Sequence, residues 1–440
     1  MARSWKFTVR CVPCPGSCSL ELQTPKYITI GSSNFTPTLP RYVIAFLLLL
    51  NSISCHKQPP QTTPTHPIYN FEVYGDIPTD HKVNMVFHEI LPDTAIAQAG
   101  RIERRGGYSI GFPKHSYELD FNEDLPLAGL PADDDWILNA NYIDKTFLRH
   151  VFSYELFQAM HPDNRAANCR YIELRRNGTY QGLYILMEKL DKSSLGIVSR
   201  DPEAVIFKEP PLFRPDLTNI AKRAQYPDNI YQQTYPDKDK EDKSFLIEEI
   251  RNILFHTPDD SLLTALTPIF DLRNLIDWQL LLLMSNNSDG IMKNFYLYKT
   301  DSATPFRFAP WDYDHSFGRD GDNELNMIRP LKLEISLLFQ RLLAINAYQE
   351  LVRVRWKELN ELELFSPVGL KRRLHDMIPR FEHLLAANFK RWPLNGPHYY
   401  DDNNFAAEIA IIEAFIDQRH ADLDSLICPM IPSLRTNDDS

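Results

Sequence analysis

The chain has 440 residues and a formal net charge of −11, which is enough length for one large domain or for two or three smaller ones. Its hydrophobic share of 43% and aromatic share of 12% suffice for a packed core and exclude an intrinsically disordered protein. Nucleic-acid backbones are bound mainly through Lys and Arg, so the acidic balance and the lack of a basic run argue against nucleic acid as the main partner.

The first 40 residues differ in character from the rest and contain Cys11, Cys14 and Cys18. A closed zinc site needs four ligands, and no further pair of Cys or His follows nearby. The three cysteines are therefore weak evidence for a metal site. We interpret residues 1–40 as a doubtful upstream extension, because the segment that follows has the features of a chain start.

Residues 41–55 have the features of a secretory signal of the lipoprotein kind. They consist of Arg41, an apolar run over 43–50, and a small-residue stretch that ends at Cys55. The apolar run is too short to span a bilayer. Residues 56–67, rich in Pro and Thr, predict a tether that holds a domain away from a membrane. The sequence therefore predicts an exported protein, anchored by a lipid on Cys55, at the cell surface or in the periplasm.

From Tyr69 to Phe121 the pattern predicts strands, with a glycine-rich loop between them. Three glycines fall between positions 106 and 111 in a chain with only 16 glycines, which indicates a backbone that approaches something closely. The loop amides, Ser109, Arg105 and Lys114 could together hold phosphates. The same residues would also form an ordinary β-hairpin turn with surface cations, since neither standard nucleotide-binding glycine motif is present.

Asp144 is the predicted N-cap of a helix that continues to about Met160 and presents a largely apolar face to a sheet. Arg149 and Glu155 are polar exceptions on this helix. Each of them could face a phosphate or a lysine, or pair with another charge at the surface.

Asn177-Gly178, between two segments of alternating hydrophobicity, is the strongest short hairpin signal in the chain. The second of these segments ends at Glu188. Residues 204–208 predict a further strand that ends at Lys208, which is either an edge lysine reaching solvent or a cation turned into a cleft.

The second half of the chain reads as mainly helical. Residues 223–243 are polar and interrupted by Pro, which predicts a surface insertion. Helices are predicted over 241–255, 271–284, 336–345, 348–359, 369–389 and 405–426. We therefore predict an α+β fold over 68–430, with a β-rich N-terminal lobe over about 68–210 and a helical C-terminal lobe over about 240–430. A nucleotide would lie in the cleft between the lobes.

The stretch from Met284 to Asn294 reads as a polar loop that joins a long apolar helix to an aromatic strand. A short turn then leads to a second strand that ends in two carboxylates. This order suits transfer of a phosphoryl group from a metal-bound nucleotide. Asp289 can orient and deprotonate an acceptor hydroxyl, while Asn294 and Asp312 can hold Mg²⁺ against the phosphates. The structural alternative is a polar loop that caps a buried helix, followed by turn carboxylates.

Five motifs in one order over about Tyr69 to Asp320 resemble the CotH kinase family. They are Arg105-Gly106-Gly107-Tyr108-Ser109 with Lys114; Trp136-Ile137-Leu138 with Asp144 and Arg149; Asn177-Gly178-Thr179-Tyr180-Gln181-Gly182-Leu183-Tyr184 with Glu188; Asn287-Ser288-Asp289 with Lys293-Asn294; and Pro310-Trp311-Asp312-Tyr313-Asp314. The resemblance implies an atypical, secretory-type protein-kinase fold with two lobes. It also implies phosphorylation of Ser or Thr in a protein substrate, with ATP and Mg²⁺ or Mn²⁺ as cofactors.

The resemblance also implies roles for single residues. In the catalytic loop, Asp289 matches the catalytic carboxylate, with Lys293 beside it. The metal ligands implied are Asn294, Asp312 and Asp314. The residues implied for ATP are Arg105, Ser109, Lys114, Glu188 and Lys208. Lys114 is preferred over Lys208 as the phosphate lysine, and Glu188 is expected near the adenine edge of the cleft or paired to a lysine.

Two other functions stay open. Asp312-Tyr313-Asp314 is also an Asp-x-Asp pair, which could hold a metal and a nucleotide sugar in a glycosyltransferase; labelled sugar donors would separate that enzyme from one that uses ATP. The third possibility is a cell-surface binding protein that keeps the kinase-like fold without catalysis.

Overall fold

The computed structural model describes residues 66–197, 201–213, 229–320, 325, 336–396, 398–399 and 401–428. All of them belong to one compact unit that covers residues 63–440. The predictions for the upstream extension with its three cysteines, for the signal at 41–55 with Cys55, and for the tether up to residue 65 lie outside the described residues.

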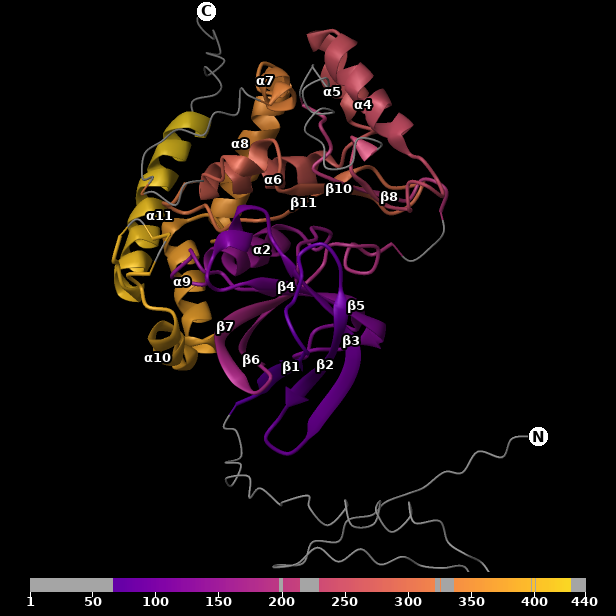
Figure 1. Cartoon of the computed structure of the whole chain (residues 1–440). Coiled ribbons are helices and arrows are strands. Elements are labelled where there is room, and N and C mark those ends of the chain that lie inside the picture. The colour runs from indigo at the N-terminus through magenta and orange to yellow at the C-terminus, as the bar shows by residue number, and fades with distance from the viewer. Residues whose placement is uncertain are drawn as a thin grey trace, which may run out of the picture. The chain divides into compact units, whose positions relative to one another are not determined.

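Seven strands of the described part form a closed barrel in the order β1-β2-β3-β4-β5-β7-β6 (Figure 1). Their bounds are β1 (Ile68–Glu72), β2 (Val83–Ile90), β3 (Ala95–Arg105), β4 (Ser116–Leu125), β5 (Asp133–Asn139), β6 (Cys169–Arg176) and β7 (Thr179–Glu188). Neighbouring strands are antiparallel except for β1 and β6, whose parallel pairing closes the barrel. Alternate side chains such as Phe87, Leu119 and Trp136 fill the interior. The prediction of a β-rich N-terminal region is confirmed.

Two turns of the barrel show why their glycines are needed. Asn177 and Gly178 join β6 to β7 with φ angles of 48° and 76°, which confirms the predicted hairpin, because a tight two-residue turn needs positive φ at both positions. The glycine-rich loop joins β3 to β4 through the short 3-10 helix η2 (Tyr108–Gly111). Gly106 has φ 133°, and a Cβ there would lie 2.3 Å from Ser109 Oγ, so only glycine fits that position.

After the barrel the chain enters a second sheet with the order β11-β10-β8-β9. Its strands are β8 (Val205–Lys208), β9 (Gln233–Tyr235), β10 (Phe295–Lys299) and β11 (Arg307–Pro310). The prediction that 223–243 is only a surface insertion is wrong for its β9 part, whose backbone pairs with β8. Trp278 of α6 (Leu272–Ser285) stacks on Phe308 of β11 with ring centroids 4.3 Å apart. This contact fixes the sheet on the central helix.

The C-terminal half is helical, as predicted. Besides α2 (Arg149–Met160) and α6, the helices are α4 (Ser244–His256), α5 (Asp259–Leu266), α7 (Leu337–Leu342), α8 (Asn346–Glu361), α9 (Pro367–Met377), α10 (Glu382–Arg391) and α11 (Phe405–Ile427). The single helix predicted over 369–389 is wrong: the 3-10 turn η6 (Ile378–Arg380) separates α9 from α10, because Pro379 has no N–H to continue the ladder. Among the described residues, no helix has both the length and the apolar character needed to cross a bilayer.

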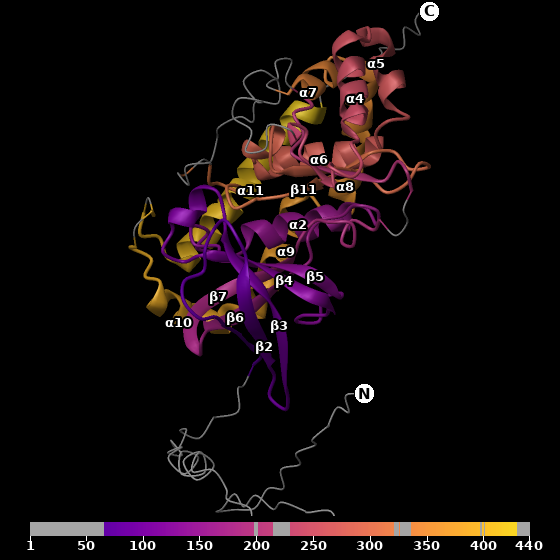
Figure 2. The same ribbon diagram turned by 45° about the vertical axis from the view of Figure 1, so that its right-hand side comes forward.

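The helical half also reaches back to the barrel. Figure 1 and Figure 2 both show α9 and α10 beside the strands, away from α4, α5 and α7. Asn388 of α10 accepts a hydrogen bond from the Leu183 amide of β7 at 3.1 Å. The barrel is therefore in contact with α10, which comes late in the chain, as well as with the segments that follow it directly in sequence.

Asp144 does not cap α2 as predicted. The residue before the helix is Leu148, and Asp144 instead accepts from the amides of Thr146 and Arg149, at 3.1 and 3.0 Å. Its carboxylate also pairs with the Arg149 guanidinium at 2.6 Å. Arg149 is thus buried in an ion pair, whereas Glu155 pairs with Arg380 at the surface, at 2.6 Å.

Arg149 belongs to a buried ion network, by which we mean Asp144, Lys145, Arg149, Arg319, Asp401 and Glu408. Arg149 lies 3.3 Å from Glu408 at the start of α11. The Asp401 carboxylate forms ion pairs with Lys145 and with Arg319, both at 2.8 Å. The network connects the beginning of α2 with the loop after Asp314 and with the beginning of α11.

A second buried pair yields a test of the fold. Asp277 of α6 is completely buried, with its carboxylate 2.7 Å from Arg355 Nε of α8 and 2.9 Å from Asn164 Nδ2. Asp277→Ala leaves a buried cation without its main partner, so we expect it to lower the free energy of unfolding by about 3–5 kcal/mol. Urea denaturation measures this loss.

The matched control is Asp417→Ala, which removes an exposed carboxylate paired with Lys371. Solvent screens that pair, so the expected loss is below about 1 kcal/mol. Equal losses for the two variants would contradict the importance that we give to the buried pair.

Candidate active site

A cavity of about 1260 Å³ lies between the barrel and the second sheet. It is lined by the glycine-rich loop, the end of β8, the loop after α6 and the segment after β11. The predicted site residues that line it are Arg105, Ser109, Lys114, Lys208, Asp289, Lys293, Asn294, Asp312 and Asp314. Segments that are far apart in sequence therefore contribute to one site.

The backbone carbonyl of Asp312 holds the loop after α6 in place. Asn287 and Asn294 each donate a side-chain N–H to this oxygen at 3.3 Å. Asn287 also accepts from the Gly290 amide at 3.0 Å, and Trp311 donates its amide to the Asn294 carbonyl at 3.0 Å. The two asparagines thus bring the loop that contains Asp289 against the segment that contains the metal candidates. Sequence reasoning assigned no role to Asn287.

Asp289 stands at the first position of a short 3-10 turn, η4 (Asp289–Ile291), at the edge of the cavity. Its Oδ2 lies 2.9 Å from Lys293 Nζ, and both side chains are partly exposed. A carboxylate in this setting can accept a proton from a hydroxyl group in the cavity. The ammonium of Lys293 balances its charge.

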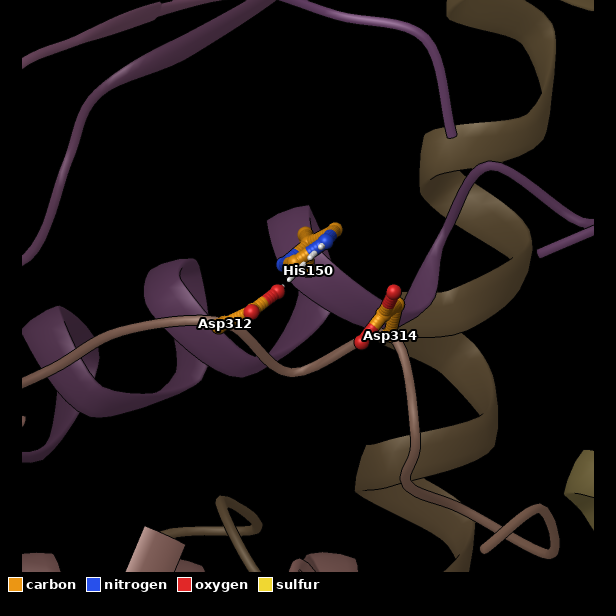
Figure 3. Close-up of side chains that lie close together, drawn as sticks. All are labelled: His150, Asp312 and Asp314. Atoms are coloured by element: carbon orange, nitrogen blue, oxygen red, sulfur yellow. Dashed lines mark ion pairs between the residues drawn. The ribbon is translucent and has the colours of Figure 1, made fainter. Parts of the chain in front are cut away.

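One close group of possible metal ligands occurs among the described residues. His150, Asp312 and Asp314 each offer a ligand atom, and these atoms lie within 4.8 Å of one another. Figure 3 shows His150 on α2 and the two aspartates on the segment after β11. Sequence reasoning missed His150, because nothing in the local pattern of α2 indicates that one of its side chains faces a segment more than a hundred residues later.

The two aspartates differ in their electrostatics. The Asp312 side chain is half exposed to the cavity, but loss of hydration in its protein surroundings and the nearby Asp314 carboxylate raise its pKa to about 6. Burial also acts to raise the pKa of Asp314, but His315, His150 and backbone N–H groups more than offset this and hold it below the ordinary value.

The donor set fits a hard divalent cation. Two carboxylates are the ligands that Mg²⁺ and Mn²⁺ prefer. Asn294 gives its side-chain N–H to the Asp312 carbonyl, so its amide oxygen is the atom that remains for a cation. Two mutually repelling carboxylates side by side are the arrangement that a cation stabilises.

The cations of the cavity have distinct settings. The Arg105 guanidinium lies over the Trp311 ring, 5.7 Å from its centroid, and 3.9 Å from the Glu118 carboxylate. Lys114 is buried, and its amine donates to the carbonyls of Ala140, at 2.7 Å, and of Leu183. Burial lowers the pKa of Lys114 well below its ordinary value. The amine of the preferred phosphate lysine is thus engaged by the barrel backbone.

Glu188 lies apart from the other predicted site residues. It is not among the residues that line the cavity. Its carboxylate accepts from the amide and the side-chain N–H of Asn168, both at 2.9 Å. The structure therefore gives Glu188 a role in joining β7 to the segment before β6, since a strand-end carboxylate can satisfy two donors there.

Comparison with known proteins agrees with the motifs. A sequence model of the family described as CotH kinase protein matches residues 102–423. The chain is also 23% identical over 220 residues to the inner spore coat protein H of Bacillus subtilis (strain 168). That alignment covers 50% of this chain and 59% of the relative, so the chain spans somewhat more than half of the relative's length.

The metal site can be tested by thermal unfolding with and without Mn²⁺. A ligand that binds only the folded state at about 100 times its Kd adds about 2.7 kcal/mol to the free energy of unfolding. We expect this gain for the wild-type protein and its loss in Asp312→Asn, which removes a ligand charge. The control is Asp376→Asn, an exposed carboxylate of α9, which should keep the gain. If Mn²⁺ stabilised Asp312→Asn as much as the wild-type protein, Asp312 would not be a metal ligand.

Proposed function

Because the chain belongs to the CotH kinase protein family, we propose that it is an ATP- and metal-dependent kinase that phosphorylates Ser or Thr in a protein. The observation that supports this proposal best is that two asparagine side chains of the loop after α6 bind the backbone carbonyl of Asp312. These side chains belong to Asn287 and Asn294, so the loop of Asp289 and the metal candidates lie at one cavity.

The proposal gives the two parts of the fold separate tasks. The barrel would act as the nucleotide lobe of an atypical two-lobed kinase, with its glycine-rich loop over the phosphates. The helical part would supply the catalytic loop and the metal-binding segment, which begins directly after β11. The cavity of about 1260 Å³ between them has room for a nucleotide and an acceptor side chain.

In the proposed mechanism, Mg²⁺ or Mn²⁺ would be held by Asp312, Asp314 and Asn294. When bound, the cation would neutralise negative charge on the phosphates of ATP. Asp289 orients the acceptor hydroxyl and takes its proton as the phosphoryl group is transferred. Lys293, 2.9 Å from Asp289, compensates charge at the acceptor. The protein mainly positions the reactants and balances charge.

For the phosphates themselves we propose Arg105, with Ser109 and Lys208, in preference to Lys114. Arg105 is oriented by Trp311 and by Glu118, and a guanidinium presents several donors in one plane to phosphate oxygens. Lys114 would have to leave two backbone carbonyls to make the same contact. Its proposed task is to fix the end of the glycine-rich loop, between β3 and β4, against Ala140 and Leu183.

We propose that the substrate lies outside the cytoplasm. The relative in Bacillus subtilis is named as a spore coat protein, and residues 41–55 of this chain have the composition of an export signal. Anchoring through a lipid on Cys55 is part of the same proposal. The Pro- and Thr-rich residues 56–67 would then serve as the tether.

The kinase proposal predicts a specific division between variants. Asp289→Asn should lower phosphoryl transfer from labelled ATP to dephosphorylated casein by about 10²–10⁴-fold, while stabilisation by ATP with Mn²⁺ is kept, because Asp289 is not a metal ligand. Asp312→Asn should lose both transfer and stabilisation. Asp376→Asn should keep both.

The same experiment separates the other functions. Transfer by Asp289→Asn at the wild-type rate would exclude Asp289 as the base. Stabilisation by UDP-glucose with Mn²⁺, and not by ATP, would favour the Asp-x-Asp sugar transferase. A lack of stabilisation by any nucleotide would favour a binding protein without catalysis.

A further inference from the structure

Asp312 has a backbone conformation that needs support. Its φ is 57°, in the left-handed region, which costs a non-glycine residue of order 1 kcal/mol or more. The residue lies two positions after the end of β11 and is the carboxylate on which the proposed metal site depends. Something in the surrounding structure must hold it there.

Two side chains one helical turn apart on α2 supply this support. Tyr154 Oη accepts a hydrogen bond from the Asp312 amide at 2.9 Å, and His150 Nδ1 accepts one from the Tyr313 amide at 3.0 Å. His150 and Tyr154 are spaced i and i+4, so they project from the same face of the helix. Both are buried, with 3% and 1% of their surface exposed. We call them the α2 clamp.

The hydrogen bonds of His150 determine where its proton lies. Since Nδ1 accepts from a backbone N–H, it has no proton, and the proton of the neutral ring is on Nε2. Nε2 lies 3.6 Å from Asp312 Oδ1, along the dashed line in Figure 3. A metal ligand must offer a lone pair, but this nitrogen presents an N–H. His150 therefore presents an N–H to Asp312, at a distance longer than a hydrogen bond but close enough for electrostatic attraction.

We propose that His150 and Tyr154 are positioning residues for Asp312, and that His150 is not a metal ligand. The two residues hold the Asp312–Tyr313 backbone through its amides, and the Nε2–H of His150 orients the Asp312 carboxylate. The cation site then consists of oxygen atoms only. This inference rests on the proposed metal-dependent function, but the tautomer can be measured without it.

The surroundings of α2 make it a suitable support. Its first residue, Arg149, donates Nε to the Ser316 carbonyl at 2.9 Å and belongs to the buried ion network. Ser316 lies just beyond the two aspartates. The helix is thus tied to the metal segment on both sides of Asp314, so the clamp cannot move independently of the carboxylates.

The first test measures the tautomer in metal-free protein labelled with ¹⁵N-histidine. Long-range ¹H–¹⁵N correlations distinguish a proton on Nε2 from one on Nδ1, and His150→Asn identifies the His150 signal by its loss. We expect Nε2–H. A proton on Nδ1 would overturn the clamp, whatever the activity of the protein.

The second test measures Mn²⁺ affinity. Removal of an orienting partner of a metal ligand typically costs about 10–100-fold in affinity, so we expect losses of this size in His150→Ala and in Tyr154→Phe. Saturating Mn²⁺ should restore kcat close to the wild-type value. His150→Asn should lose less than His150→Ala, because its amide oxygen can still accept from the Tyr313 amide. Unchanged affinity in both His150→Ala and Tyr154→Phe would overturn the inference.

A matched control is Tyr171→Phe, which removes another tyrosine hydroxyl, one that donates to the Phe147 carbonyl at 3.0 Å away from the cavity. It should leave Mn²⁺ affinity unchanged. Electron spin-echo spectra of bound Mn²⁺ should show no directly bound nitrogen, and a nitrogen signal lost in His150→Ala would make His150 a ligand. If the wild-type protein binds no Mn²⁺, the proposed function fails, while the tautomer measurement still decides the clamp.

Discussion

The buried ion network around Arg149 is the constraint on which the rest of the structure depends. It places opposite charges from the start of α2, the loop after Asp314 and the start of α11 within 2.6 to 3.3 Å of one another. Removing Arg149 would leave the buried carboxylate of Asp144 without its cation, which is costly in a poorly hydrated interior. The network therefore favours one arrangement of barrel and helices over others.

This arrangement decides the geometry of the cavity. The barrel contributes the glycine-rich loop and Arg105, and the second half of the chain contributes the two aspartates and the loop that contains Asp289. Their separation is set by α2, which lies between the barrel and α6 in Figure 1 and Figure 2. Because α10 also packs on β7 through Asn388, the two parts are connected on both sides. Both connections fix the distances between the charged groups of the cavity, on which charge–charge interactions depend strongly.

Local sequence patterns were sufficient for much of the fold. The Asn177-Gly178 hairpin, the strand that ends at Lys208 and most helices follow from turn chemistry and hydrophobic periodicity, which act over a few residues. One error has a local cause and the other a cause distant in sequence. Pro379 divides a helix whose apolar period continues on both sides, and β9 pairs with β8 although its own residues are polar.

By itself the sequence determined the family, the α+β composition and the order of Asp289, Asn294 and Asp312, because these depend on residue types at fixed spacings. Only the tertiary structure decided which charges face the cavity. Lys114 and Glu188 read as candidate ligands in sequence, yet their partners are backbone carbonyls and Asn168. His150 and Tyr154 read as ordinary helix residues, yet they contact Asp312 and Tyr313. The reason is that burial, hydrogen bonds and ion pairs arise from contacts between segments far apart in the chain, and local sequence patterns do not predict such contacts.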